Sequence, residues 1–193
     1  FGGVTRGRIS SQSLKRSIRL SSQFKEAFGD QLAPRTQYLP QMVSDELQTG
    51  NFSVPDEELP EVMTAIVRFF RKEEQSNTAS KVGQTPQLVF FPPSYAHSIA
   101  ELISKFRRDN LVAYERFIGR KKPRNQSEEW QLFGREAEEA SKSLTVDIAL
   151  FGRMTTSDLV VNVEASSQVA HAISTHEVLI ESDYFTAMDD KKE

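Results

Sequence analysis

The sequence predicts an α+β fold with an inserted helical part. Between residues 60 and 142, many apolar side chains recur at the three- and four-residue spacing of helices that bury one face. The runs at Gln87–Phe91 and Leu144–Phe151, and shorter ones at Glu177–Ile180 and Tyr184–Thr186, have the composition of strands instead. Helices and strands that separate along the chain in this way are typical of the α+β class.

The first expected element is an amphipathic helix that begins at Ser10 or Ser11, because a serine hydroxyl can accept a bond from a free backbone N–H there. Gly29 follows it where a C-terminal cap is expected. One side of this helix is apolar and is expected to face the core, whereas the other side is polar and basic. The apolar side comprises Leu14, Ile18, Phe24 and Phe28, and the basic side comprises Gln12, Lys15, Arg19 and Ser22, with Arg16 at its edge.

Prolines interrupt residues 30–60, so only short helices are expected there, one of them at Gln41–Gln48. Pro60 suits the first turn of a longer helix. The later elements are expected, in order, as a helix from Pro60, a strand at Gln87–Phe91, helices after Ser94 and over about residues 110–118, a helix that ends near Lys142, a strand at Leu144–Phe151 and a short helix at Glu164–Ile173.

Composition limits the class of protein. The 193 residues suit one domain, or one domain with a large insertion. Cysteine is absent, which excludes disulfides and thiolate metal sites and fits a reducing cytoplasm. The apolar runs are too short to span a membrane, so no membrane contact is expected. The chain begins at Phe1 without an initiator methionine, and we expect it to be a fragment of a longer protein.

Charge is distributed unevenly along the chain. The net charge is −3, yet residues 1–25 carry six basic side chains and no acidic one, and Lys105–Arg124 carries eight basic side chains. A polyanion responds to the local charge, because salt screens interactions beyond about 10 Å. The second cluster is as consistent with a solvated surface as with a contact to a nucleic acid.

The segment Gly2–Arg19 gives the strongest signal for phosphate binding. Glycines let backbone N–H groups approach an anion closely, and a helix N-terminus at Ser10 or Ser11 carries unpaired N–H groups and partial positive charge. Lys15 and Arg19 would extend the same side by one turn. A plain amphipathic helix with a solvated basic side is the alternative.

Catalytic patterns are weak. His171 and His176 are five residues apart and lack a completing ligand, and the adjacent pair Asp189 and Asp190 lies in a charged tail that is typical of surface. The sequence contains no nucleophile elbow and no phosphate-binding loop of the Walker type. We therefore expect no catalytic residue, no metal and no cofactor. An RNA endonuclease that uses His171 or Asp147 and a purely protein-binding domain remain alternatives.

Met154 follows Gly152 and Arg153 at the end of an expected strand. An exposed apolar side chain in such a place can wedge between bases while the cation holds a phosphate. Phe185 and Thr186 could act in the same way. Taken singly, such residues lie more often in the core, and the core is the favoured interpretation.

Three stretches together resemble a known family. They are FGGVTRGRISSQSLKRSIR at the N-terminus, DIALFGRM at Asp147–Met154 and QVAHAISTHEVLIESDYFTAMDD at Gln168–Asp190. They resemble, in order, the marked segments of the CasC family, the repeated backbone subunit of type I-E CRISPR Cascade complexes. The section between the first two agrees only in its helical character.

The resemblance implies a non-catalytic subunit with a hand-like shape. An RNA-recognition-motif-like (ferredoxin-like) palm would comprise residues 1–30 and 144–193, the latter leading into a thumb, and a helical insertion called the fingers would comprise residues 31–143. Its partners would be guide RNA (crRNA), further copies of itself in a filament-like backbone, other Cascade subunits, and target DNA through the guide. Sequence choice would belong to base pairing.

The resemblance also implies the contact residues. Candidates for the RNA backbone are Arg8, Ser10, Ser11, Gln12, Lys15, Arg16 and Arg19, and candidates beside a displaced nucleotide are Arg153, Met154, Phe185 and Thr186. Family members have a strand before the first stretch and continue well past the third. We therefore expect the palm sheet of this chain to be incomplete, with exposed edges that favour aggregation.

Overall fold

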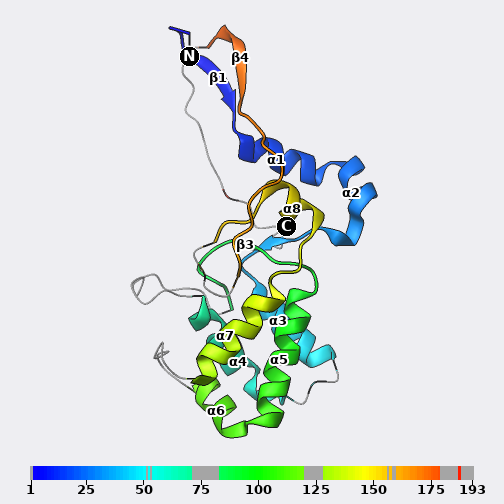
Figure 1. The fold of residues 1–193 in the computed structure, drawn as a ribbon, viewed down its shortest axis with the longest axis vertical. Helices are drawn as coiled ribbons and strands as arrows, with labels where there is room; N and C mark the ends of the chain where they lie inside the picture. The colour runs from blue at the N-terminus through cyan, green and yellow to red at the C-terminus, as the bar shows by residue number, and fades with distance from the viewer. Residues whose placement is uncertain are drawn as a thin grey trace.

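A computed structural model describes residues 2–50, 52, 54–70, 83–119, 128–155, 157, 160–178 and 187. The described part is elongated, with a lobe of packed helices at one end and a two-stranded ribbon at the other (Figure 1). The short helices α1, α2 and α8 lie between these two ends (Figure 1).

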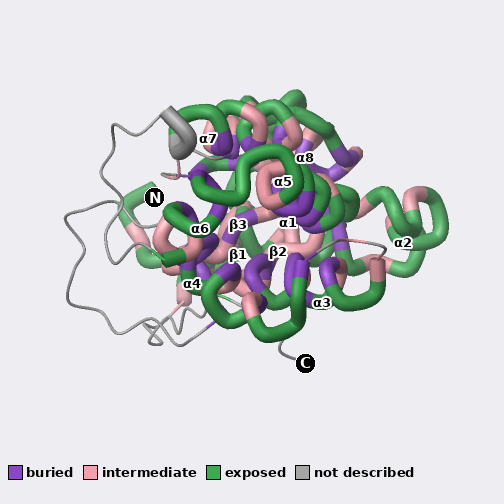
Figure 2. Tube along the Cα trace, turned by 90° about the horizontal axis from the view of Figure 1, so that it is seen from below, coloured by how far each residue is buried: buried purple, intermediate pink, exposed green. Residues whose placement is uncertain are grey.

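The helical lobe contains five helices that pack on one another: α3 (Leu39–Thr49), α4 (Leu59–Phe69), α5 (Tyr95–Asp109), α6 (Leu111–Gly119) and α7 (Glu128–Ala140). Their inward sides form the largest core of the described chain (Figure 2). Proline lies in the first turn of α3 and of α4, where its missing N–H costs no helical bond. Asn110 separates α5 from α6, and its side chain accepts a bond from the Ala113 N–H at 3.0 Å. The helices expected in this section from apolar spacing are thus confirmed.

Glu58, at the end of the 3-10 helix η2 (Asp56–Glu58), joins three elements of this lobe. Its carboxylate accepts bonds from Arg107 Nε of α5 at 3.0 Å and from the Tyr114 hydroxyl of α6 at 2.8 Å. The bond from Arg107, and after it the bond from Tyr114, holds the pKa of Glu58 below its ordinary value of 4.5, although burial acts in the opposite direction.

We expect Glu58 to make the stability of the lobe sensitive to acid. A carboxylate with a lowered folded-state pKa stabilises the fold above its unfolded-state pKa, and this contribution is lost as the pH falls through the folded-state pKa. Urea unfolding from about pH 6 to about pH 3 should therefore show a steeper loss of stability for the wild type than for Glu58→Gln, which cannot titrate. Parallel losses in the two proteins would contradict this role of Glu58.

The rest of the described chain combines short helices with two small sheets. β1 (Arg6–Ile9) pairs with β4 (Ala172–Glu177) in antiparallel register, with Arg8 opposite Ile173 and a bulge between Arg6 and Arg8. β2 (Arg35–Thr36) pairs in the same sense with β3 (Val89–Phe90). The helices are α1 (Ser11–Leu20), α2 (Ser22–Phe28) and α8 (Val146–Phe151), and the 3-10 helix η1 (Gly29–Gln31) follows α2.

The α+β class is therefore confirmed. A single palm sheet of the RNA-recognition-motif type is not seen, since the described residues contain two separate two-stranded sheets. The domain names palm, fingers and thumb stay predictions. No helix of the described part is long and apolar enough to cross a membrane.

Three expected elements were wrong. The expected strand Leu144–Phe151 is the helix α8, because a short apolar run has the same composition in a buried helix as in a strand. The expected helix Glu164–Ile173 does not form: the N–H groups of Ser166 and Ser167 donate at 3.0 Å to the carbonyls of Ala149 and Leu150, in α8. The expected single N-terminal helix is divided at Ser21, whose hydroxyl accepts from the Phe24 N–H at 3.3 Å and begins α2.

Candidate nucleic-acid interface

The three stretches that resemble the CasC family lie together in space wherever the structure describes them. Lys15 of α1 places its Nζ 3.4 Å from the Phe151 carbonyl at the end of α8, which joins the first stretch to the second. The first stretch also pairs with the third through β1 and β4, and the Ser11 N–H donates to His171 Nδ1 at 2.9 Å. Segments about 140 residues or more apart in sequence thus form one surface beside the helical lobe.

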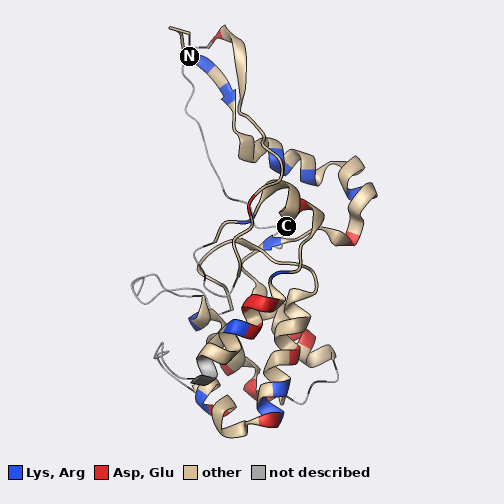
Figure 3. Cartoon of the chain, in the orientation of Figure 1, with Lys and Arg blue, Asp and Glu red and all other residues tan. Residues whose placement is uncertain are grey.

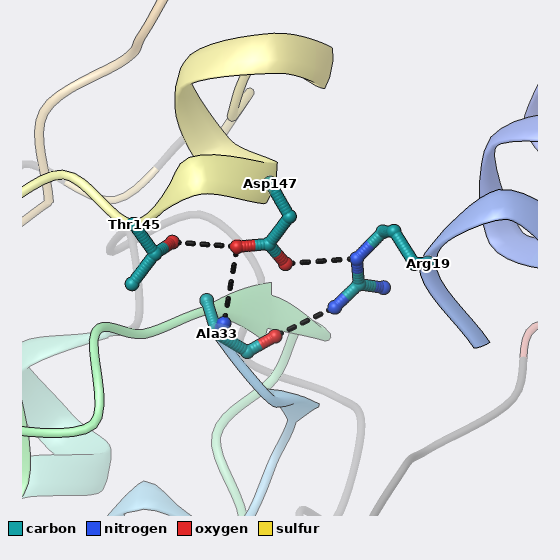
Figure 4. A network of polar contacts seen from close by, with 4 residues as sticks. All are labelled: Arg19, Ala33, Thr145 and Asp147. Carbon is teal, nitrogen blue, oxygen red and sulfur yellow. Dashed lines mark hydrogen bonds and ion pairs between the residues drawn. The ribbon is translucent and has the colours of Figure 1, made fainter. Parts of the chain in front are cut away.

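A buried ion pair fixes α1 to α8 (Figure 4). Arg19 Nε donates to Asp147 Oδ2 at 2.8 Å, and the other Asp147 oxygen accepts from the Thr145 hydroxyl at 2.6 Å and the Ala33 N–H at 3.1 Å. Arg19 also donates to the Ala33 carbonyl at 2.6 Å and lies over the Phe90 ring, 4.3 Å from its centroid. Both side chains are buried, so this arginine has a structural role between α1, α8 and Ala33.

The inward side of α1 therefore differs from the expected one. The expected apolar core side includes Ile18, which is 41% exposed, whereas Arg19 is 8% exposed. Asp147 and the end of α8 draw Lys15 and Arg19 inward, because a carboxylate and helix C-terminal carbonyls both attract cations. The prediction that Arg19 contacts RNA has to be corrected, because this burial leaves its guanidinium no access to an RNA phosphate.

Two N–H groups at the start of α1 already have partners in the protein. The Ser13 N–H donates to the Ser10 hydroxyl at 3.1 Å, and the Ser11 N–H donates to His171 as described above. Because His171 Nδ1 accepts this bond, its proton lies on Nε2 whenever the bond is made. Ser10 and Ser11 thus fix the junction between β1 and α1. The N–H groups of Ser11 and Ser13 are therefore not free to bind a phosphate.

The cations of this region that are at least partly exposed lie along the ribbon and α1 (Figure 3). Arg8 is exposed on β1, and Lys15 and Arg16 are half-buried on α1 beside the exposed Gln12. Arg6 instead donates across the ribbon to the Ser174 carbonyl at 3.0 Å. The acidic side chains lie mainly on the helical lobe, so the ribbon and α1 form the more basic end of the described chain (Figure 3).

Arg153 is a second arginine that the structure places inside the protein. It is 2% exposed, and all three nitrogens of its guanidinium donate to backbone carbonyls. Burial lowers its pKa, although an arginine starts so high that it stays charged near neutral pH. The prediction that this cation holds a phosphate needs the same correction as that for Arg19.

Met154, by contrast, points into solvent. Its side chain is 93% exposed, although Arg153 before it and Thr155 after it are 2% and 7% exposed. A single exposed apolar side chain is common on protein surfaces, but this one is held outward between two buried neighbours and is accessible to a partner. The sequence alternatives of core residue and wedge are thus decided in favour of an exposed position.

The other predicted contacts are only partly open to test. Phe185 and Thr186 lie outside the described residues, as does 120–124 in the second basic cluster. In the described part of that cluster, Arg107 pairs with Glu58 and Arg108 lies 3.1 Å from Asp109. These ion pairs favour the interpretation of a structural or solvated surface there.

Sequence reasoning missed the roles of Asp147, of His171 and of Gly152, which has a positive φ and lies against the backbone of Val163 and Ala165. A single carboxylate inside the apolar run LTVDIALF was the available signal for Asp147, since an acid in such a run needs a buried partner. The roles of Gly152 and His171 depend on contacts with distant segments, which no local pattern shows. Among the described residues, no three His, Asp or Glu side chains come together as a metal site.

The comparisons with known proteins agree with this arrangement. No curated protein matches the chain. A solved chain described as a "CRISPR RNA-guided surveillance complex" has the same fold, with a TM-score of 0.62, 23% sequence identity and alignment over 92% of this chain. This chain spans about half the length of that one, since 51% of it is covered. A match over residues 1–193 shows that the chain belongs to the CRISPR-associated family described as CT1975-like protein.

Proposed function

We propose that this protein is a non-catalytic backbone subunit of a type I-E CRISPR surveillance complex, which binds guide RNA along its phosphates and presents it to target DNA. Family membership and the fold shared with a surveillance-complex chain support this proposal. Its partners would be the guide RNA, further copies of itself and other Cascade subunits. The two small sheets would then belong to a palm of the RNA-recognition-motif type.

The observation that carries the proposal is the position of Met154. The residue is 93% exposed, and it lies three residues after Phe151, whose carbonyl is 3.4 Å from Lys15 of the basic helix α1. An apolar wedge beside cations suits a single strand, because the wedge can separate bases while the cations attract phosphates without reading sequence. Arg8, Lys15 and Arg16 would supply those cations.

The endonuclease alternative is less well supported. The two groups available to it are engaged: the Asp147 carboxylate accepts three hydrogen bonds, one of them from its ion-pair partner Arg19, and His171 Nδ1 accepts from the Ser11 N–H. A general base has to reach the proton that it removes. Asp147 is 2% exposed and cannot reach a substrate without unfolding of its surroundings.

Binding of a single-stranded guide RNA across a salt series tests the proposal. Arg8→Glu should weaken binding and reduce the dependence of log K on log salt by at least about 0.7, the value for one phosphate contact on a single strand. Met154→Ala should weaken binding by about fivefold or more and leave the salt dependence unchanged, because an apolar contact releases no counterion.

The matched controls lie on the helical lobe. Arg135→Glu makes the same charge change at an exposed site on α7, and Leu111→Ala truncates another exposed apolar side chain. Both control variants should bind RNA as the wild type does. If Arg8→Glu and Arg135→Glu weaken binding equally, net charge alone governs the affinity and the assigned surface is wrong.

A further inference from the structure

The chain around Met154 is braced on both sides. Arg153 donates through Nε to the Val161 carbonyl at 3.0 Å, through Nη1 to the Phe90 carbonyl of β3 at 3.3 Å and through Nη2 to the Ser141 carbonyl, just after α7, at 2.8 Å. One guanidinium therefore connects the segment of Met154 to the sheet, to the helical lobe and to the returning chain. A planar guanidinium can direct donors at three acceptors at once, which a lysine ammonium on a flexible stem cannot do with the same geometry.

The backbone and the following residue complete the brace. The N–H and the carbonyl of Arg153 bond to Val163 at 2.9 and 2.8 Å, as an isolated antiparallel bridge. After Met154, the Thr155 N–H donates to Asn162 Oδ1 at 2.7 Å. The side chain of Met154 thus leaves the surface from a turn that is fixed immediately before and after it.

We propose that Arg153 is a positioning residue, which touches no RNA itself but holds Met154 at the place where it separates neighbouring nucleotides. The inference rests on the proposed RNA-binding function, and it adds an explanation of what holds Met154 in its outward position. A side chain that separates two bases has to keep a fixed position between them. If it can move away, the stacking of the two bases is restored. The brace fixes the backbone from which Met154 projects, so that only the three rotatable bonds of the side chain itself stay free.

The test uses a guide RNA that carries the fluorescent base 2-aminopurine, scanned through successive positions, because unstacking of this base raises its fluorescence. The wild type should raise the fluorescence at certain positions, and Met154→Ala should lose that increase. Arg153→Lys should lose most of the increase while the salt dependence of RNA binding stays at the wild-type value. The double variant Arg153→Lys/Met154→Ala should lose no more than Met154→Ala alone, because both changes remove the same wedge.

A second variant separates positioning from a general loss of stability. Asn162→Ala removes the brace after Met154 at an exposed residue, and it should also reduce the fluorescence increase. Tyr114→Phe removes a bond in the distant helical lobe and should keep the full increase. Equal effects of Asn162→Ala, Arg153→Lys and Tyr114→Phe would show that Arg153 acts only through stability.

The outcomes also separate this inference from the proposed function. A lower salt dependence for Arg153→Met, which removes the charge, would show that the guanidinium contacts a phosphate, and a full fluorescence increase for Arg153→Lys would show that Met154 needs no brace. Either result overturns the positioning role and leaves RNA binding intact. Absence of RNA binding by the wild type would overturn both.

Discussion

Replacement of Asp147 by alanine is expected to lower the free energy of unfolding by about 3–5 kcal/mol, because Arg19 would stay buried without its partner. The Arg19 and Asp147 side chains are 9% and 1% exposed, so water cannot easily replace the lost carboxylate. The same change leaves the Ala33 N–H without its acceptor. Urea unfolding followed by far-UV circular dichroism measures the loss.

The matched control is Glu139→Ala, which removes an acid from an exposed pair with Lys142. That variant should leave the free energy of unfolding nearly unchanged, because an exposed ion pair contributes little to stability. The double variant Arg19→Met/Asp147→Leu should recover much of the stability, since no unpaired charge remains buried. If Asp147→Ala is as stable as Glu139→Ala, the pair does not hold α1 against α8.

Replacement of Gly152 by alanine is also expected to lower the stability of the fold strongly, though less than Asp147→Ala does. Gly152 has a φ of +78° and a ψ of 164°, a backbone conformation essentially restricted to glycine, which costs a residue with a Cβ about 1–3 kcal/mol. An added Cβ would also lie 2.9 Å from the Val163 carbonyl oxygen and 3.1 Å from the Ala165 nitrogen, so backbone would have to move. Because Val163 bonds to Arg153, this movement should also displace Met154.

Gly83→Ala separates backbone conformation from crowding. Gly83 has a φ of +85°, and an added Cβ would meet no atom within 4 Å. Gly152→Ala should therefore lower the melting temperature clearly more than Gly83→Ala, and it alone should lose the wedge signal of Met154 on fluorescent RNA. If Gly152→Ala and Gly83→Ala lose equal stability and both keep the fluorescence increase, the prediction is wrong. The segment before Met154 would then have room for a side chain.

Much of the helical lobe could be predicted from the sequence. The positions of α3 to α7 follow from apolar residues at helical spacing together with Pro40, Pro60 and Asn110, because these signals are local. The resemblance of three separated stretches to one family also survives, because it depends on residue order alone. Helix signals and residue order can both be read from the sequence, because neither depends on what a segment packs against.

The tertiary structure alone decided which cations face solvent. Helical spacing placed Lys15 and Arg19 on one side of α1 but could not show that this side meets Asp147, which lies 128 residues after Arg19. The adjacent residues Arg153 and Met154 also differ in exposure. Arg153 is buried and donates to three carbonyls, whereas Met154 is 93% exposed. Burial depends on which distant acceptors surround a side chain. The sequence therefore determined the helices of the lobe and the family, whereas long-range packing determined which side chains are exposed.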